Sequence, residues 1–208
     1  KRGIYPEKME HVYLGPSYTT EECVAACESH EGKPVYEKVD DVPRKAAELL
    51  NDGNPVAWCQ GRMEFGPRAL GGRSILGNPG YKGIADKINH QIKFRERWRP
   101  FCPSILDTVA PEIIQTDHPA PFMTITFDVD KTWSQRIPEV VHEDGTSRVQ
   151  IVSEHTNPRY HALLKEMETL TGNGAVLNTS MNRRGEPMVC SPADALNMFF
   201  GSDLQYLL

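Results

Sequence analysis

The sequence predicts a single domain of the α/β (α+β) class, with a mixed, twisted sheet flanked by helices. Helical and strand-like periodicities alternate along the chain, which indicates this class. Its 208 residues suit one sizeable domain, and a composition of 39% hydrophobic and 25% charged residues allows a packed core. No run approaches the roughly 18 apolar residues of a membrane span, so we expect a cytoplasmic chain without a membrane partner.

The first elements are predicted by their caps. The first 16 residues are polar and interrupted by Gly and Pro, which indicates a linker. Thr19 and Glu22 then form a capping box, which predicts a helix to about His30. Asp41 is a good N-cap residue for a second helix, which we expect to end at Gly53.

Strands and helices interleave along the rest of the chain, which favours a mixed sheet. Strands are predicted where short apolar or alternating runs stand between breakers, at 55–60, 74–76, 101–106, 122–129, 148–152, 175–178 and 203–208. Helices are predicted from helical spacing and caps at 81–93, 157–170 and 191–200.

One segment is basic although the chain is acidic. The formal net charge is −5, yet residues 60–100 hold nine Lys and Arg against three Asp and Glu, a balance of +6. Overall acidity argues against nonspecific binding of nucleic acid. The segment is either a solvated helix face or a site for an anionic ligand, and we favour the second interpretation.

Within this segment, residues 61–74 (GRMEFGPRALGGRS) interleave arginine with glycine. Glycine lets backbone N–H groups approach a ligand closely, and the planar fork of arginine binds phosphate oxygens in pairs. The chain contains neither a Walker loop nor a dinucleotide-binding fingerprint. The residues alone therefore indicate an anion site of unspecified chemistry.

Further candidate ligand contacts lie downstream. Arg148 begins a predicted strand, and Asn178, Thr179 and Ser180 follow at the C-terminal end of another, where α/β sheets commonly bind ligands. An exposed strand-end charge and an ordinary turn explain these residues equally well. The histidines are scattered, and five cysteines give neither a disulfide framework nor zinc-like spacing, so we predict no metal site.

Several long motifs occur in a fixed order: GRMEFGPRALGGRSILG at 61–77, RWRPF at 97–101, DGT at 144–146, RVQ at 148–150, LNTS at 177–180 and GEP at 185–187. Together they resemble the C-terminal part of the NodU and tobramycin-type O-carbamoyltransferases. The resemblance runs from about Pro34 to the end of the chain and is weakest in residues 1–33. Gly72 stands where we expect Asn.

The resemblance implies a YrdC-like domain that binds ATP, with Mg²⁺ accompanying the nucleotide, and carbamoyl phosphate. It would form carbamoyl-adenylate and release pyrophosphate, and an N-terminal domain absent from this chain would pass the carbamoyl group to an acceptor hydroxyl. Residues 1–33 would be a linker and lead-in helix from that domain, and 34–208 the YrdC-like carbamoyltransferase domain. Matched by motif, the contacts to ATP and carbamoyl phosphate fall on the catalytic cations Arg68, Lys93, Arg99 and Arg148, and on Asn178, Thr179 and Ser180.

Fixed cations of this kind would stabilise the charge that builds up during phosphoryl transfer, without a protein nucleophile. Two alternatives stay open. One is a threonylcarbamoyl-adenylate-forming enzyme of the YrdC type. The other is an RNA-binding module, because charged and aromatic residues alternate at Lys93, Phe94, Arg95, Arg97, Trp98, Arg99 and Phe101. The acceptor substrate cannot be read from this chain.

Overall fold

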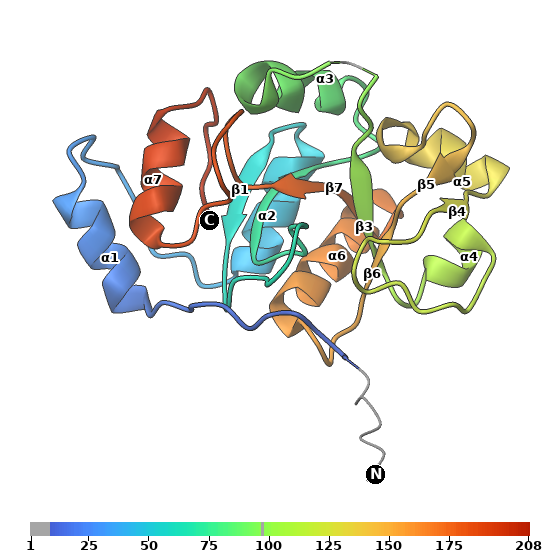
Figure 1. The fold of residues 1–208 in the computed structure, drawn as a ribbon, viewed down its shortest axis with the longest axis horizontal. Helices are drawn as coiled ribbons and strands as arrows, with labels where there is room; N and C mark the ends of the chain where they lie inside the picture. Colours follow the sequence, from blue (N-terminus) through green and yellow to red (C-terminus); the bar gives the residue numbers. More distant parts are fainter. Residues whose placement is uncertain (1–8, 97) are drawn as a thin grey trace, which may run out of the picture.

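A five-stranded mixed sheet lies at the centre of the computed structural model, which describes residues 9–96 and 98–208 (Figure 1). All neighbouring strands run antiparallel except β3 and β6, which are parallel. In spatial order the strands are β1 (Val56–Cys59), β2 (Arg73–Gly77), β7 (Ala175–Ser180), β3 (Cys102–Leu106) and β6 (Gln150–Val152). This arrangement confirms the predicted fold class. Residues 1–8 of the predicted linker and Arg97 of the basic segment lie outside the described residues.

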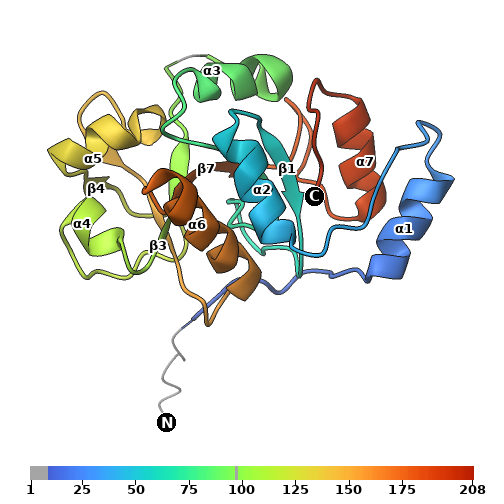
Figure 2. The ribbon, with the colours of Figure 1, turned by 180° about the vertical axis from the view of Figure 1, so that it is seen from behind.

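Helices α2 (Val42–Asn51) and α6 (Pro158–Thr171) cover one face of the sheet, as the two opposite views show (Figures 1 and 2). Each begins at a residue whose side chain accepts a backbone N–H: Asp41 for α2 and Asn157 for α6. Helix α6 ends at Gly172, whose φ of 74° lies in the left-handed region that favours glycine.

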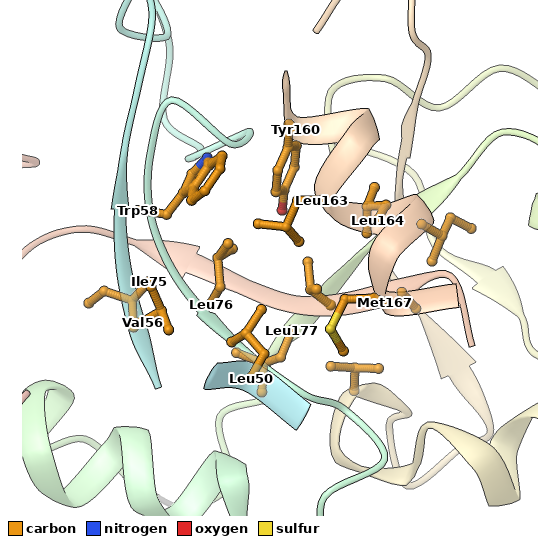
Figure 3. Close-up of a cluster of buried hydrophobic side chains, with 14 of the residues drawn as sticks. Leu50, Val56, Trp58, Ile75, Leu76, Tyr160, Leu163, Leu164, Met167 and Leu177 are labelled. Atoms are coloured by element: carbon orange, nitrogen blue, oxygen red, sulfur yellow. The ribbon is translucent and has the colours of Figure 1, made fainter. Parts of the chain in front are cut away.

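The hydrophobic core fills the space between these two helices and the sheet (Figure 3). Leu50 of α2, Leu76 of β2 and Leu163 of α6 meet there, and all three are fully buried. Burying a leucine side chain stabilises a fold by about 1.5–3 kcal/mol, so this layer supplies much of the stability on which the site depends.

The remaining helices flank the sheet. Helix α1 (Thr20–Ser29) has the predicted capping box but buries none of its residues. It lies beside α7 (Pro192–Phe200), where the rings of His30 and Phe200 stack with their centroids 4.7 Å apart. The other elements are α3 (Ile84–Ile88), η1 (Asn89–Lys93), α4 (Ala110–Ile114), α5 (Lys131–Arg136), η2 (Pro138–Val140), β4 (Phe127–Asp128) and β5 (Thr146–Ser147).

Four predicted elements were wrong in extent. The expected strand 148–152 is shorter, because β6 begins only at Gln150 and Arg148 lies between β5 and β6. The expected helix 81–93 is a short α3 followed by the π-helical turn η1. The expected strand 122–129 is reduced to β4, because Met123 takes a left-handed φ of 53° that breaks an extended run. Segment 203–208 forms only one isolated bridge in the described chain, from Leu207 to Ala57.

Helices α4 and α5 were not predicted, because five or six residues are too few to show helical periodicity. Among the residues that the structure describes, no helix combines the length and the apolar character needed to cross a bilayer.

Candidate functional site

A cavity of about 210 Å³ lies where β7 ends and β3 begins. The two strands are antiparallel neighbours, and Cys102 pairs with Asn178. This pairing brings residues 99–102 beside residues 178–180. Six of the seven predicted site residues line the cavity: Arg68, Arg99, Arg148, Asn178, Thr179 and Ser180.

The seventh predicted residue, Lys93, is buried behind the cavity wall by the π-helical turn. Its Nζ donates to the backbone oxygen and hydroxyl of Ser180, and to the backbone oxygen and Oδ1 of Asn182 at 3.0 and 2.8 Å. These acceptors favour the ammonium form. Burial, followed by the charges of Arg95 and Arg99, has the larger opposing effect and lowers the pKa of Lys93 to about 7. An anion in the cavity would restore the ammonium form.

Two cavity arginines keep all their side-chain donors free. Within the described part of the chain, the guanidiniums of Arg68 and Arg99 make no hydrogen bond or ion pair. Burial, together with the charges of Arg148 and Arg99, lowers the pKa of Arg68. Like charges held together in this way repel one another until an anion binds between them.

Arg148 and Arg95 are the other two arginines that line this cavity. Arg148 Nη2 lies 2.9 Å from Cys102 Sγ, whereas its buried Nε has no partner among the described residues. The guanidinium carbon of Arg95 stands 4.2 Å from the centroid of the Phe101 ring, a cation–π contact. Arg95 was counted in the basic segment but was not predicted as a site residue, since its orientation depends on the left-handed φ of 44° at Phe94.

Four successive backbone N–H groups of the glycine–arginine loop, at residues 70–73, bind side chains of the protein itself, contrary to the expectation that they face a ligand. Glu64 is buried, and its Oε1 accepts from the N–H groups of Leu70 at 2.7 Å, Gly72 at 2.5 Å and Arg73 at 3.3 Å. A carboxylate in such a nest fixes the loop strongly, because each bond is charge-assisted.

Only one of the three arginines in this loop lines the cavity, namely Arg68. Arg62 donates to the backbone oxygens of Leu14 and Gly15. Arg73 is fully buried, and its guanidinium donates to the backbone oxygens of Pro16, Gln60, Gly61, Gly72 and Cys190. These two arginines bind backbone oxygens of the chain itself, and neither lines the cavity.

Two of the four glycines of the loop, Gly71 and Gly72, are required by close packing. Gly71 has a φ of 97°, and a Cβ there would lie 2.2 Å from the ring of Tyr160. A Cβ at Gly72 would lie 2.9 Å from Glu64 Oε2 and 3.0 Å from the backbone oxygen of Arg62. The loop conformation thus accounts for glycine at the position where the sequence motif suggested Asn.

A larger cavity of about 620 Å³ adjoins the first and shares Arg99, Pro100 and Phe101 with it. Its lining includes the exposed indole of Trp98 and the imidazole of His142. Nδ1 of that imidazole lies 3.1 Å from the hydroxyl of Thr146, and its Nε2 is buried without a partner among the described residues. The sequence analysis treated the histidines as scattered and did not assign His142 to a site.

The described residues contain no group of three or more His, Cys, Asp and Glu side chains that could hold a metal ion. The smaller cavity offers guanidinium, amide and hydroxyl groups, whereas the larger one adds imidazole and indole groups and four carboxylates: Asp86, Glu139, Glu143 and Asp144.

Comparison with known proteins finds relatives that align with nearly the whole chain. An uncharacterized protein of Synechocystis sp. is 39% identical over 225 residues, which cover 98% of this chain and 37% of that protein. Nodulation protein NolNO of Sinorhizobium fredii is 39% identical over 97% of this chain and 30% of its own length. The chain thus spans about a third of the length of the curated relatives it matches.

Among solved structures, full-length HypF in the phosphate- and nucleotide-bound form aligns with a TM-score of 0.54 and 17% identity, over 79% of this chain and 20% of that chain. At this identity the likeness concerns the fold alone, which is YrdC-like. The family model described as carbamoyltransferase C-terminus matches residues 47–208. Because that model covers most of the sequence, and relatives at 39% identity cover nearly all of it, the chain belongs to the carbamoyltransferase C-terminus family.

Proposed function

We propose that this domain binds ATP and carbamoyl phosphate together and forms carbamoyl-adenylate, releasing pyrophosphate. The observation that carries the proposal is the arginine cavity in a member of a carbamoyltransferase family. Four guanidiniums from three separate segments of the chain surround a small space that no described carboxylate lines. Arginine forks of this kind match phosphate oxygens in geometry and charge.

The sizes of the two cavities support a division of ligands. The space of about 210 Å³ suits a molecule as small as carbamoyl phosphate. A nucleotide needs more room, and pockets for ligands of that size typically measure about 300–1,000 Å³. The adjoining cavity of about 620 Å³ falls in this range, and Arg99 belongs to both cavities. We therefore place the nucleoside in the larger cavity and the reacting phosphates at the shared wall.

The proposed reaction has two steps. Water first cleaves carbamoyl phosphate into carbamate and phosphate. An oxygen of carbamate then forms a bond to the α-phosphorus of ATP, and the bond between that phosphorus and the bridging oxygen of pyrophosphate breaks. Arg68, Arg99 and Arg148 would stabilise the negative charge on the phosphoryl oxygens and on the leaving pyrophosphate. Lys93 would support them by fixing Ser180.

Magnesium would enter bound to the phosphates of ATP, since no described cluster could hold it, and no step here runs through a protein-bound metal. We assign delivery of the carbamoyl group to an acceptor hydroxyl to an N-terminal domain of the full-length protein. We place the reaction in the cytoplasm, where ATP and carbamoyl phosphate are available.

The test is to titrate the purified chain with each ligand and to follow pyrophosphate release when ATP, Mg²⁺ and carbamoyl phosphate are combined. We expect saturable binding of both ligands, weakened by salt, and release only with the complete mixture. Absence of binding for both ligands at millimolar concentration would overturn the proposal.

Two further arms of this experiment address the alternatives. Pyrophosphate release with threonine and bicarbonate in place of carbamoyl phosphate would indicate a threonylcarbamoyl-adenylate-forming enzyme. A salt-sensitive gel shift with tRNA would indicate RNA binding. We do not expect RNA binding, because Lys93 is buried against Ser180 and the guanidinium of Arg95 lies over the Phe101 ring. We do not expect threonine with bicarbonate to replace carbamoyl phosphate, because the chain belongs to a carbamoyltransferase family.

A further inference from the structure

We propose that Tyr13 is a positioning residue for the arginine cavity, because it fixes the short turn that presents Arg68 to the ligand. This inference rests on the proposed function, which places an anion in that cavity. Tyr13 belongs to residues 12–16, which we call the strap. The strap lies ahead of the region that the family model matches, residues 47–208, and it lines neither of the two cavities of the site.

Backbone hydrogen bonds tie the strap to the start of the glycine–arginine loop. Gly15 N donates to the backbone oxygen of Met63 at 2.9 Å, and Met63 N donates to the backbone oxygen of Pro16 at 2.9 Å. The contact is close, since a Cβ at Gly15 would lie 2.9 Å from the Cβ and the backbone oxygen of Met63. The strap therefore follows the loop just before the turn that carries Arg68.

Two consecutive residues of the strap hold the two ends of that turn. The backbone oxygen of Val12 accepts from Phe65 N at 2.7 Å, and the hydroxyl of Tyr13 donates to the backbone oxygen of Leu70 at 2.7 Å. Only residues 66–69 lie between these two points. Residues 66–68 are exposed and make no hydrogen bond within the described part of the chain. The position of Arg68 therefore depends on the ends of the turn.

The phenol of Tyr13 is suited to this role by its surroundings. Burial raises the pKa of Tyr13 to about 12, so the hydroxyl keeps its proton at neutral pH and remains a donor. The ring packs against the buried cluster of Leu70, Cys102 and Met123. Cys102 and Met123 also line the arginine cavity, and Cys102 Sγ lies 2.9 Å from Arg148 Nη2. Tyr13 thus supports the cavity both at the turn and at its wall.

A fixed turn matters because the cavity gathers like charges. The charges of Arg148 and Arg99 act on Arg68, and their repulsion favours movement of Arg68 out of the empty cavity. A turn free to follow this repulsion would have to be ordered again by each ligand that binds, at a cost in conformational entropy. The strap removes that cost by holding the turn in place beforehand.

The experiment measures the affinity of the full chain for carbamoyl phosphate and for ATP by calorimetric titration in the cold, where each variant is shown to be folded by circular dichroism. In Tyr13→Ala we expect both affinities to fall on the order of tenfold, because Arg68 loses its fixed position. Tyr13→Phe keeps the ring, and the oxygen of Leu70 still accepts from Gln150 Nε2 at 3.0 Å. This conservative variant should restore both affinities to within about threefold of wild type.

A double-mutant cycle tests whether Tyr13 acts through Arg68. In the background Arg68→Ala, the change Tyr13→Ala should lower the affinities by less than about threefold, whereas in Arg99→Ala the tenfold loss should persist. Tyr18→Ala is the matched control. The hydroxyl of Tyr18 lies 4.0 Å from Cys190 Sγ, and Tyr18 lines neither cavity. We expect its affinities to stay within about twofold of wild type.

The outcomes separate the two claims. If folded Tyr13→Ala binds both ligands as tightly as wild type, Tyr13 contributes only to stability, so the inference is overturned and the proposed function stands. A full tenfold loss in the Arg68→Ala background would also overturn it, because Tyr13 would then act without Arg68. If wild-type protein binds neither ligand, the proposed function fails and the positioning role fails with it.

Hydrogen exchange in the wild-type chain covers the case in which Tyr13→Ala does not fold. Because a ligand and the strap fix the same turn, a bound ligand must in return stabilise the strap. Saturating ATP should therefore slow the exchange of the Gly15 and Phe65 amides about tenfold in wild type, but not in Arg68→Ala. Exchange rates that are equal with and without ATP in wild type would contradict the inference.

Discussion

Arg73 and Arg99 carry the same charge and come from the same basic segment, yet the structure uses them in opposite ways. Arg73 is 1% exposed, and its guanidinium donates to five backbone oxygens. The guanidinium of Arg99 is bound to none of the described residues and belongs to the walls of both cavities. A count of charges in the sequence cannot distinguish an arginine that stabilises the fold from one whose donors are available to a ligand.

The comparison implies that substitutions at different arginines can weaken either the stability of the fold or the binding of ligands, one without the other. Cations of the first kind, such as Arg62 and Arg73, donate to backbone oxygens of the chain. Cations of the second kind, such as Arg68 and Arg99, keep theirs at the cost of mutual repulsion. The former should therefore affect unfolding, and the latter should affect binding and turnover.

The largest predicted effect is a loss of stability in the variant Arg73→Met. This change leaves several buried carbonyl oxygens without a donor, and each such group costs about 1–3 kcal/mol. We expect the free energy of unfolding to fall by about 3–5 kcal/mol, measured by urea denaturation followed by tryptophan fluorescence. The matched change Arg99→Met should alter it by less than about 0.5 kcal/mol. Equal losses in the two variants would remove the distinction.

The next effect concerns catalysis. Arg99→Ala should lower the rate of pyrophosphate release about 100- to 1,000-fold, or about 2.7–4 kcal/mol, because it removes a donor aimed at developing charge. The free energy of unfolding should be unchanged in this variant. Lys82→Ala is a suitable control, since Lys82 is an exposed cation of the same basic segment that lines neither cavity. A comparable loss of rate in the control would reduce the effect to overall charge.

Glu64 connects the two groups of arginines. Its Oε1 fixes the backbone of residues 70–73, while Arg68 stands on the same loop. Glu64→Gln keeps an oxygen acceptor but loses its charge, so we expect unfolding to become easier by about 1–2 kcal/mol.

Because the loop carries Arg68, the affinity for ATP should also fall by several-fold, as measured by calorimetry. A change in stability with no change in affinity would show that Arg68 is positioned without Glu64.

Local signals in the sequence were enough for most of the fold. The capping box of Thr19 and Glu22 and the helical spacing after Asn157 located α1 and α6 closely, because caps act over three or four residues. The π-helical turn before Phe94 was missed, since no local pattern distinguishes it from a regular helix.

Most polar residues that line the arginine cavity could be predicted from the sequence, but the contacts of the individual arginines could not. Arg73 finds acceptors as far away as Pro16 and Cys190, so only the folded chain shows that its donors are used. Glu64 entered the sequence analysis only as a charge to subtract, although it organises the loop. Arg95 was counted but not selected, because its contact with Phe101 depends on a backbone reversal.

The most specific effect is expected from Lys93, which shares properties of both groups of cations. Its Nζ is bound internally, as in Arg73, but it lies beside the cavity and its pKa is lowered to about 7. An anion nearby favours the ammonium form, so above pH 7 the binding of ATP must take up a proton. Affinity should therefore be greatest below about pH 7 and fall as the pH rises towards 9, by at most about tenfold (1.4 kcal/mol) per unit.

The ligand contributes little to this slope, because a phosphate monoester is already ionised well above its second pKa of about 6. Calorimetry in buffers of different ionisation enthalpy would count the proton directly. Lys93→Met should bind ATP more weakly at pH 7 and lose both the slope and the proton uptake. A wild-type affinity that stays constant from pH 7 to 9 would mean that Lys93 is charged throughout, and its four internal acceptors would then place it with Arg73 among the structural cations.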